Sequence, residues 1–580
     1  MQSASMEMSG GTQSRTATSQ AELDRHLEVL SENAKPFARL PAAEKASLLR
    51  ACVPHLLSAA QDWASAACQA KGLRLDSSFA AEEWLGGPYV TMRCLRKLIG
   101  SLADIAANGK PQLPSGAFQL ARDGRVEVVV MPGDAYDHAI SAGFTCRMRM
   151  QPGWDDRKVR DEQASFYGKS DPEGGVSLIL GAGNVASIPP TDALYKMFHE
   201  GKVCIVKLNP VNEYLGPFYE RAFSPLVKRG YLRFVYGGSE VGSYLSYHPQ
   251  ICDVHITGSD RTHDLIVWGP PGEERKTRQT QNDPLLKKNI TSELGCVTPV
   301  MIVPGAYTSR ELRMLAENIA TQVENNGSFN CNAAKVLVVS ESWPQRQELL
   351  TQVQEILQDI PPRRAYYPGA FERFAKLTAN RTVRQMGRAG DGELPWTLIC
   401  GVSASTTDEP LFSTEPFCSI LTEVALPQTD AAEFVAAAAR FANDRLWGTL
   451  SCSLYLPPSV EKRPDVQLAM EQACDQLRYG VVGINHWPAV AYGAMTPPWG
   501  GHPSATLLDI QSGIGFVHNT FMLEGIEKAI LRGPLVPAPK PPWFVTHKRS
   551  PEIAQRLLKF EAEPSWLKIP GIALLAFLGA

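Results

Sequence analysis

The sequence predicts an α/β protein with two parallel sheets, on three observations. From Gly175 to Pro304, short apolar runs such as VSLIL and VCIVK alternate with helical stretches, which is typical of βαβ units with strands buried on both faces. A second series of the same kind runs from Ser309 to about Asn485. The chain has 580 residues, more than one hydrophobic core usually supports, so two or more domains are expected.

Composition and charge indicate a globular protein that acts on a small molecule. Hydrophobic residues make up 44% of the chain and charged residues 20%, close to the averages for globular domains. The formal net charge is -3, which creates no overall field that would attract nucleic acid or an anionic membrane. Lys and Arg form no basic face interleaved with aromatic residues, so we expect no nucleic-acid partner.

The cysteines indicate a reducing compartment. The chain has 12 of them and no Cys-x-x-Cys pair, which argues against a disulfide framework or a zinc knuckle. We therefore expect free thiols and a cytoplasmic location. The eleven histidines are scattered, without acidic or thiol partners at ligand spacing, and no metal site is predicted.

The segments outside the two βαβ series have their own patterns. Residues 1–20 are rich in Ser, Thr and Gly and predict a disordered tail. From Arg125, the runs VEVVVMP and FTCRMRMQPG indicate a β-hairpin or arm. The Pro-rich stretch 532–544 predicts an extended segment over the surface. The apolar stretch 569–580 has 12 residues, too few to cross a bilayer, so we expect it to dock onto the body.

An ordered series of motifs carries the functional prediction. The turn LGAGN follows the strand VSLIL, but it does not complete G-x-G-x-x-G because Ala186 stands at the third position, so alone it is weak. The motifs that follow are Lys207 in VCIVKLNP, Gly258 and Ser259 in VHITGS, Glu293 in ITSELG, Cys331 in NNGSFNCNAA, and Glu415 with Phe417 in TEPF. In order and spacing this series, from Val176 to Gly501, resembles the NAD(P)-dependent aldehyde dehydrogenase superfamily.

The resemblance implies an organisation for the whole chain. It implies two Rossmann-like parallel-sheet domains, plus a β-hairpin oligomerisation arm that pairs with a neighbouring subunit in a homodimer or homotetramer. The implied ranges are a nucleotide-binding domain from 21–124 and 173–295, the arm from 125–172, a catalytic domain from 296–497 and a C-terminal extension from 498–580. A hydrophilic insertion interrupts the pattern within 269–284.

Three residues are expected to carry the chemistry. A free cysteine is usually a small buried hydrophobe, but Cys331 follows a polar loop and precedes a strand, a context in which a sulfur can face a cleft. By resemblance, Cys331 is the nucleophile and Glu293 the general base. An acid in apolar surroundings has a raised pKa, which suits that role. Asn184, with the backbone N–H of Cys331, would form the oxyanion hole.

The remaining motifs are assigned to NAD or NADP. By resemblance, Lys207 reaches the adenosine ribose, Gly258 and Ser259 lie near the pyrophosphate, and Glu415 holds the nicotinamide ribose beside Phe417.

Departures from the family pattern leave alternatives open. Pro210 stands where NAD-preferring relatives often have a glutamate, so NAD and NADP both remain candidates. Cys296 replaces a glycine and is expected to add bulk beside the cofactor. The turn 181–184 is similar to that of acyl-CoA and acyl-ester reductases.

The predicted function is oxidation of an aldehyde to a carboxylic acid through a cysteine thioester. The alternatives are a CoA-linked acyl or aldehyde oxidoreductase and a non-catalytic scaffold. Bulky aromatics such as Trp487 and the Tyr366-Tyr367 pair indicate an apolar aldehyde.

Overall fold

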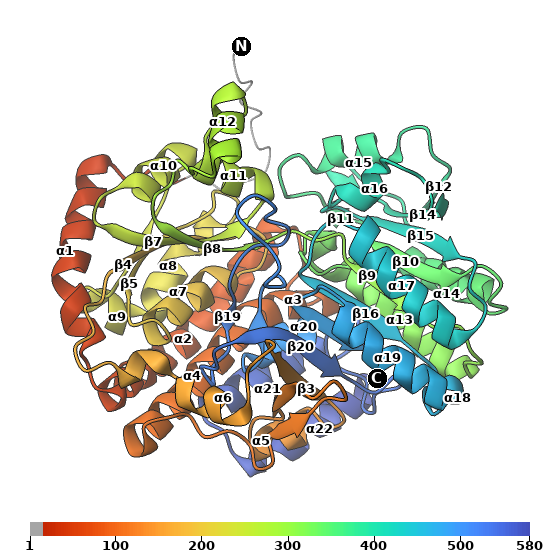
Figure 1. The fold of residues 1–580 in the computed structure, drawn as a ribbon, viewed down its shortest axis with the longest axis horizontal. Helices are drawn as coiled ribbons and strands as arrows, with labels where there is room; N and C mark the ends of the chain where they lie inside the picture. Colours follow the sequence, from red (N-terminus) through yellow and green to blue (C-terminus); the bar gives the residue numbers. More distant parts are fainter. Residues whose placement is uncertain (1–14) are drawn as a thin grey trace.

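Two β-sheets organise the molecule (Figure 1). The computed structural model describes residues 15–580. A five-stranded sheet occupies one half and an eleven-stranded sheet the other. The predicted α/β class, with parallel strands in both halves, is confirmed. Residues 1–14 of the predicted N-terminal tail lie outside the described part. Residues 15–19 contact the body, where Thr18 N–H donates to the carbonyl of Tyr236 at 3.1 Å.

The five-stranded sheet is wholly parallel, in the order β6-β5-β4-β7-β8. Its central strands coincide with the apolar runs of the sequence, and every residue of β4 and β5 is buried. Continuous burial is what a strand covered by helices on both faces requires. The strands are β4 (Val176–Leu180), β5 (Val203–Lys207), β6 (Leu232–Val235), β7 (Ile251–Gly258) and β8 (Asn289–Leu294).

Helices cover both faces of this sheet. Leucines at helical spacing on the first helix face β5 and β4, as the periodicity predicts. The hydrophilic insertion forms the helix α12, which has no buried residue and projects from the body in Figure 1. The helices of this half are α1 (Gln20–Ala38), α2 (Ala42–Ala70), α3 (Ala81–Trp84), α4 (Val90–Asn108), α7 (Ile188–Phe198), α8 (Gly216–Ala222), α9 (Ser224–Lys228), α10 (Ser239–Tyr247), α11 (Asp260–Trp268) and α12 (Glu273–Gln281).

The eleven-stranded sheet has the order β1-β2-β3-β20-β17-β16-β9-β10-β15-β14-β12. Its core, from β17 to β14, is parallel. Its strands are β1 (Phe118–Leu120), β2 (Val126–Met131), β3 (Thr145–Met150), β9 (Pro299–Ile302), β10 (Val336–Ser340), β12 (Val383–Met386), β14 (Trp396–Ser403), β15 (Ile420–Leu426), β16 (Ser451–Tyr455), β17 (Val481–Ile484) and β20 (Ile526–Arg532). Two short pairs lie outside it, β11 (Arg363–Arg364) with β13 (Glu393–Leu394) and β18 (Pro498–Trp499) with β19 (Val517–His518).

Two helical layers bury the faces of this sheet. Alternate residues of β10 show the division, because successive side chains of a strand point to opposite faces. Leu337 and Val339 join the core formed with α13 and α14, whereas Val336 and Val338 join the core formed with α17 and α19. The helices are α13 (Ser309–Glu324), α14 (Arg346–Asp359), α15 (Ala370–Thr378), α16 (Pro410–Ser413), α17 (Ala431–Arg445), α18 (Pro458–Glu461), α19 (Pro464–Gln476) and α20 (Ala489–Ala494).

The predicted arm belongs to the eleven-stranded sheet. Its strands β2 and β3 are antiparallel neighbours, and the connection between them contains α5 (Ala135–Ile140). Strand β3 pairs with β20, and β20 pairs in parallel with β17, where Val481 lies opposite Ala529. The helix α6 (Asp156–Glu162) follows β3. Pairing of the arm with a neighbouring subunit stays a prediction.

The C-terminal residues cover the body in two ways. The Pro-rich stretch was expected at the surface, but Phe544 is only 2% exposed and lines a cavity, and Lys540 pairs with Glu317 of α13. The helix α21 (Ser550–Ala562) packs on α2, α3 and α4, and α22 (Ile569–Leu578) docks on α21. Within residues 15–580, no helix combines the length and apolar character needed to cross a membrane.

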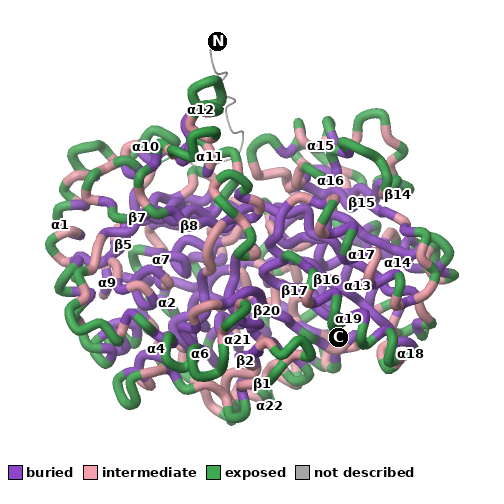
Figure 2. The backbone as a smooth tube through the Cα atoms, in the orientation of Figure 1, coloured by how far each residue is buried: buried purple, intermediate pink, exposed green. Residues whose placement is uncertain are grey.

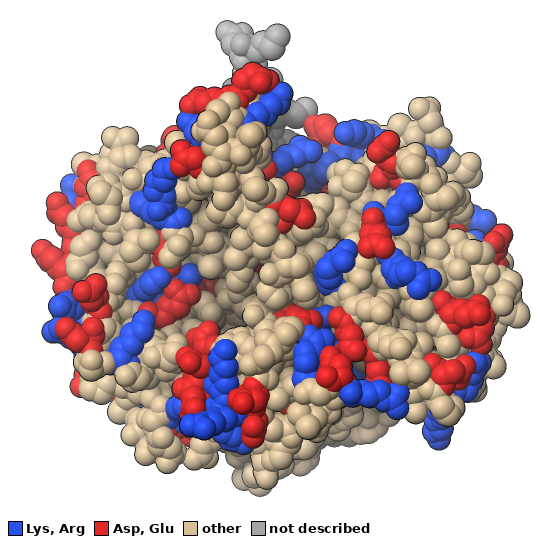
Figure 3. All heavy atoms as spheres, viewed as in Figure 1, with Lys and Arg blue, Asp and Glu red and all other residues tan. Residues whose placement is uncertain are grey.

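Burial and charge follow this architecture. The two sheets form the buried interior in Figure 2, and exposed residues gather on the outer helices and loops. Acidic and basic side chains are interspersed over the face shown in Figure 3, without a large region of one sign. The chain passes from the five-stranded sheet to the eleven-stranded sheet between β8 and β9, across residues 295–298.

Candidate active site

The carboxyl ends of the parallel strands form one edge of the five-stranded sheet. The strand order reverses between β4 and β7, and ligands of open α/β sheets bind at such a switch point. The turn with Asn184 follows β4, Lys207 ends β5, Gly258 ends β7 and Glu293 lies near the end of β8. The predicted residues of this half therefore meet at one edge.

Two cavities meet at Cys331. The first, which we call the edge cleft, runs along the sheet edge and is lined by residues that include Leu180, Lys207, Ser259, Glu293, Glu415 and Phe417. The second, which we call the aromatic channel, is lined by Phe79, Tyr89, Trp487, Tyr492, Trp499 and Trp543, among others. Asn184, Ile188 and Cys331 line both cavities. A thiol at this junction is accessible from either side.

A strained turn presents the thiol. Asn326, Gly327 and Ser328 have φ angles of 57°, 63° and 65°, a left-handed run just before Cys331. A serine rarely adopts this conformation, and such strain persists where the surrounding structure enforces it. Thr298 Oγ1 donates to the carbonyl of Cys331 at 3.2 Å and fixes the loop from the other side. Cys331 itself is partly exposed, unlike the buried cysteines of the strands.

The electrostatics at Cys331 keep the resting sulfur protonated. Burial raises the pKa of the Cys331 thiol well above its usual value, and the Glu293 and Glu415 carboxylates raise it further. The Lys335 ammonium partly opposes this increase. Because the thiolate is the reactive form, a base must remove the proton before the sulfur can attack.

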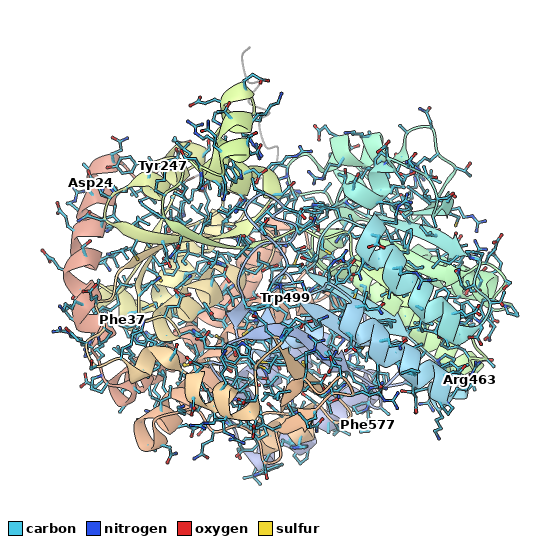
Figure 4. The ribbon with its side chains drawn as sticks, viewed as in Figure 1. Asp24, Phe37, Tyr247, Arg463, Trp499 and Phe577 are labelled. Carbon is cyan, nitrogen blue, oxygen red and sulfur yellow. The ribbon has the colours of Figure 1, made fainter. Side chains whose placement is uncertain are left out.

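Glu293 has the properties of such a base. Its side chain is buried, and burial, followed by repulsion from Asp192, raises its pKa to about 7. Interactions with the Cys331 thiol and the Trp499 indole oppose the increase. Trp499 lies between the two halves of the molecule in Figure 4. Among the described residues, Oε2 of Glu293 has no hydrogen-bond partner, so this oxygen is free to accept a proton.

Asn184 is held against the loop of Cys331. Its Nδ2 donates to the carbonyl of Phe329 at 3.1 Å. The backbone carbonyl of Asn184 accepts from Lys71 Nζ and from Asn326 Nδ2, both at 3.0 Å. An amide nitrogen carries two hydrogens, so one remains for an oxyanion beside the sulfur. The structure thus brings Asn184, Glu293 and Cys331 together.

Glu415 is anchored by an ion pair. Its Oε1 lies 3.4 Å from Nζ of Lys335, which is 1% exposed and donates to the carbonyl of Asn330 at 2.7 Å. Burial raises the pKa of Glu415, and Lys335 opposes the increase. A steric constraint explains why the SELG motif has a glycine at position 295. A Cβ at Gly295 would lie 2.0 Å from Oε2 of Glu415, so a larger residue would displace that side chain from its position in the cleft.

The other predicted residues also line the edge cleft. Lys207 is buried, which lowers the pKa of its ammonium. Ser259 caps α11 by accepting from the N–H of Thr262, and Gly258 lies beside it. Phe417 has a φ of 42° and contacts Tyr367, with ring centroids 4.8 Å apart.

One expectation about the cleft is wrong. Cys296 is fully buried, does not line the edge cleft and directs its sulfur toward the carbonyl of Ser451 at 3.9 Å. A residue that follows a strand end can turn into the core of the next sheet, which a sequence motif does not reveal. Three contributors were not foreseen: Lys335, Asp192 and Trp499. Two of them had a sequence signal. Lys335 is a lone cation at the start of the apolar run KVLVV, and Trp499 lies in PPWGG, which closes the resembling series at Gly501.

No protein-family model matches the sequence. Solved structures do resemble it. Glyceraldehyde-3-phosphate dehydrogenase from Methanocaldococcus jannaschii, complexed with NADP, is 13% identical, with a TM-score of 0.58 over 90% of this chain and 96% of that one. An aldehyde dehydrogenase C mutant from Pseudomonas syringae, complexed with NAD+ and octanal, is 16% identical, with a TM-score of 0.59 over 89% and 90%. Lactaldehyde dehydrogenase from Escherichia coli is 18% identical, with a TM-score of 0.56 over 88% and 91%. The chain therefore has the aldehyde dehydrogenase fold.

Proposed function

We propose that the protein oxidises an aldehyde to a carboxylic acid with NAD or NADP, using Cys331 as the nucleophile. The observation that carries this proposal is the meeting of the edge cleft and the aromatic channel at Cys331, with Glu293 and Asn184 beside it. An aldehyde and a dinucleotide that react at one thiol must reach it through separate cavities. The solved neighbours that bind NADP, or NAD+ with octanal, support the same chemistry.

The residues of the edge cleft fit a dinucleotide. Oε1 of Glu415 is buried in an ion pair with Lys335 but accepts no hydrogen bond among the described residues, and a ribose hydroxyl would donate one. Lys207 would contact the adenosine ribose, and Gly258 and Ser259 at the start of α11 would approach the pyrophosphate. Phe417 would lie beside the nicotinamide. When bound, the nicotinamide would accept a hydride from the substrate carbon.

The protein's own groups perform the first half of the reaction. Glu293 takes the proton of the Cys331 thiol, and the sulfur adds to the aldehyde carbon, so a C–S bond forms and the carbonyl π bond opens onto oxygen. The Nδ2 of Asn184 donates to that oxygen, which stabilises the developing charge. Loss of the hydride from the same carbon leaves a thioester on Cys331.

Water then releases the product. Glu293 first releases the thiol proton to solvent and then removes a proton from a water molecule, whose oxygen attacks the thioester carbon. The C–S bond breaks, the sulfur leaves as the thiolate, and the acid is released. Its pKa of about 7 suits both proton transfers near neutral pH. We favour water over CoA as the acceptor because Glu293 is retained beside Cys331.

The proposal extends to assembly and location. We propose a cytoplasmic homodimer or homotetramer, with the arm at the subunit contact. In a single chain β20 already covers the edge of β17, so the remaining edges of the large sheet are β1 and β12. Light scattering would test assembly, and a strictly monomeric particle would contradict it.

A cofactor-reduction assay tests the activity. The purified protein would be offered a panel of aldehydes with NAD or NADP, with and without CoA. We expect reduction without CoA, and its loss in Cys331→Ala. Cys252→Ala is the matched control, because Cys252 is exposed and lies outside both cavities. Turnover that persists in Cys331→Ala, or that requires CoA, would contradict the mechanism.

A further inference from the structure

The C-terminal segment forms one wall of the aromatic channel. Pro542, Trp543, Phe544, Val545 and His547 all line it, together with residues of α3, α4 and the loop into α20. We call residues 542–550 the C-terminal strap. The strap lies beyond the last motif of the predicted family pattern, which ends at Gly501. The wall is therefore a contribution of residues to which that pattern gives no role.

Polar contacts fix the strap to α13. The N–H of Val545 donates to Oγ1 of Thr321 at 3.0 Å, and Oγ1 of Thr546 donates to Oε2 of Glu317 at 2.7 Å. Lys540, just before the strap, pairs with the same Glu317 oxygen at 2.8 Å. These three contacts lie side by side on one helix, so the strap is held in a defined position on α13.

Aromatic packing sets the position of the wall. Trp543 lies edge-on to His486 and to Phe144, with ring centroids 5.8 and 6.0 Å apart. Burial lowers the pKa of His486 to about 3, so this ring is uncharged at neutral pH. The Trp543 indole, which lines the channel, thus packs against two uncharged rings.

The charged groups of the channel are already neutralised. Among the described residues that line it, each Lys, Arg and Glu has an ion-pair partner in the protein. Lys71 pairs with Glu83 at 2.7 Å. Arg363 pairs with Glu82 at 3.0 Å and also with Glu324. Arg93 is held by two carboxylates, those of Asp137 at 2.8 Å and Glu561 at 2.6 Å.

The protonation states of Glu324 and His547 also limit the charge in the channel. Burial raises the pKa of Glu324 well above its usual value, which favours its neutral form beside Arg363. Burial lowers the pKa of His547, the only histidine among the described lining residues, which favours its neutral form. A phosphate or carboxylate on a substrate would find no unpaired cation here, and burying it unpaired is costly.

We infer that the aromatic channel binds a neutral aldehyde with an extended apolar or aryl group, which packs against the C-terminal strap while its carbonyl carbon meets Cys331. The inference rests on the proposed function, whose substrate class it names. Charged aldehydes, such as glyceraldehyde 3-phosphate or succinic semialdehyde, are excluded by the same walls.

Chain-length dependence of turnover tests the inference. We expect kcat/KM to rise from propanal to decanal by about fourfold per methylene until the channel is filled, which is the factor that ~0.8 kcal/mol of transfer free energy per buried CH2 represents. Glyceraldehyde 3-phosphate and succinic semialdehyde should be poor substrates. A flat profile, or a preference for either charged aldehyde, would overturn the inference while leaving aldehyde oxidation intact.

Variants of residues that line the channel test whether the strap contacts the substrate. Trp543→Ala should lower the ratio of kcat/KM for decanal to that for propanal by at least tenfold, because it removes apolar surface from the strap. Ala489→Trp, on another wall of the channel, should lower the same ratio by obstruction. Trp566→Ala is the control, since Trp566 is 55% exposed and does not line the channel. An unchanged ratio in folded Trp543→Ala would contradict the role of the strap.

A binding measurement separates this inference from the proposed reaction. Decanamide is an uncharged analogue that cannot be oxidised as an aldehyde, and its binding can be followed by calorimetry in the wild-type protein and in Cys331→Ala. We expect decanamide to bind more tightly than propanamide, with the difference reduced in Trp543→Ala. If no aldehyde is turned over but decanamide shows this pattern, the proposed function fails and the apolar site stands. If decanamide does not bind, the site itself is wrong.

Discussion

Lys335 and Glu415 face each other with 3.4 Å between Nζ and Oε1, and Lys335 follows Cys331 by four residues. One cation therefore acts on both the thiol and the carboxylate of the edge cleft. It lowers the pKa of each, opposing the increase that burial causes. Loss of this cation should affect cofactor binding and sulfur reactivity together.

Lys335→Met tests this relationship. We expect the cofactor KM to rise by roughly tenfold or more. Glu415 would lose the partner that holds it in place for the ribose, and a hydrogen bond to a charged group is worth about 1.5–3 kcal/mol. The variant should also unfold at a lower temperature, since it leaves Glu415 buried without its partner. The double variant Lys335→Met/Glu415→Gln leaves no unpaired charge and should recover part of that loss. Equal melting temperatures for the two variants would argue against the pairing.

The pH dependence of kcat/KM should report the ionisation of Glu293. As a base it must be deprotonated, so kcat/KM should increase with pH and level off above a pKa of about 7. Glu293→Gln should abolish this acidic limb and reduce turnover by about 10²- to 10⁴-fold. A profile that is flat from pH 5 to 8 in the wild-type protein would argue against Glu293 as the base.

Asp192→Asn should move the acidic limb to lower pH. Asp192 is buried, accepts a hydrogen bond from Oγ1 of Thr257 at 2.8 Å, and raises the pKa of Glu293 by charge repulsion. Asparagine keeps nearly the same shape and can still accept from Thr257, but it removes the negative charge. The measurement is the apparent pKa of kcat/KM, and a shift to higher pH would contradict the electrostatic assignment.

Asn184→Ala should slow the chemical step. Loss of one oxyanion donor typically costs about 10²- to 10³-fold in kcat. The substrate KM should change much less, because the donor acts mainly on charge that develops in the transition state. Single-turnover kinetics would distinguish this from a binding defect. A variant with normal kcat and a raised KM would place Asn184 in substrate binding instead.

Gly295→Ala should impair cofactor binding without unfolding the protein. The added Cβ would lie 2.0 Å from Oε2 of Glu415, so that side chain must move away from the cleft. The expected result is a raised cofactor KM with a near-normal melting temperature. Gly100→Ala is the control, since Gly100 lies in α4 and its Cβ would meet nothing within 4 Å.

The sequence predicted most reliably the features that depend on local pattern. Strands β4 and β5 coincide with VSLIL and VCIVK, because strands buried on both faces need uninterrupted apolar residues. The residues of the candidate site lie together in the structure because the ends of parallel strands share an edge. Prediction failed where long-range packing decides. Cys296 turns into the core. Phe544 is buried beside Val545, whose N–H donates to Thr321 of α13, more than 200 residues earlier in the chain.

The pairing of β20 with β17 bears on how the chain folds during synthesis. Strand β17 ends at residue 484, but β20 begins only at residue 526. Until the ribosome has made residues 526–532, the edge of β17 presents unpaired N–H and C=O groups, which favour association with other strands. Nascent chains should therefore be most prone to aggregation after β17 has emerged and before β20 has, and termination between the two strands should produce insoluble protein.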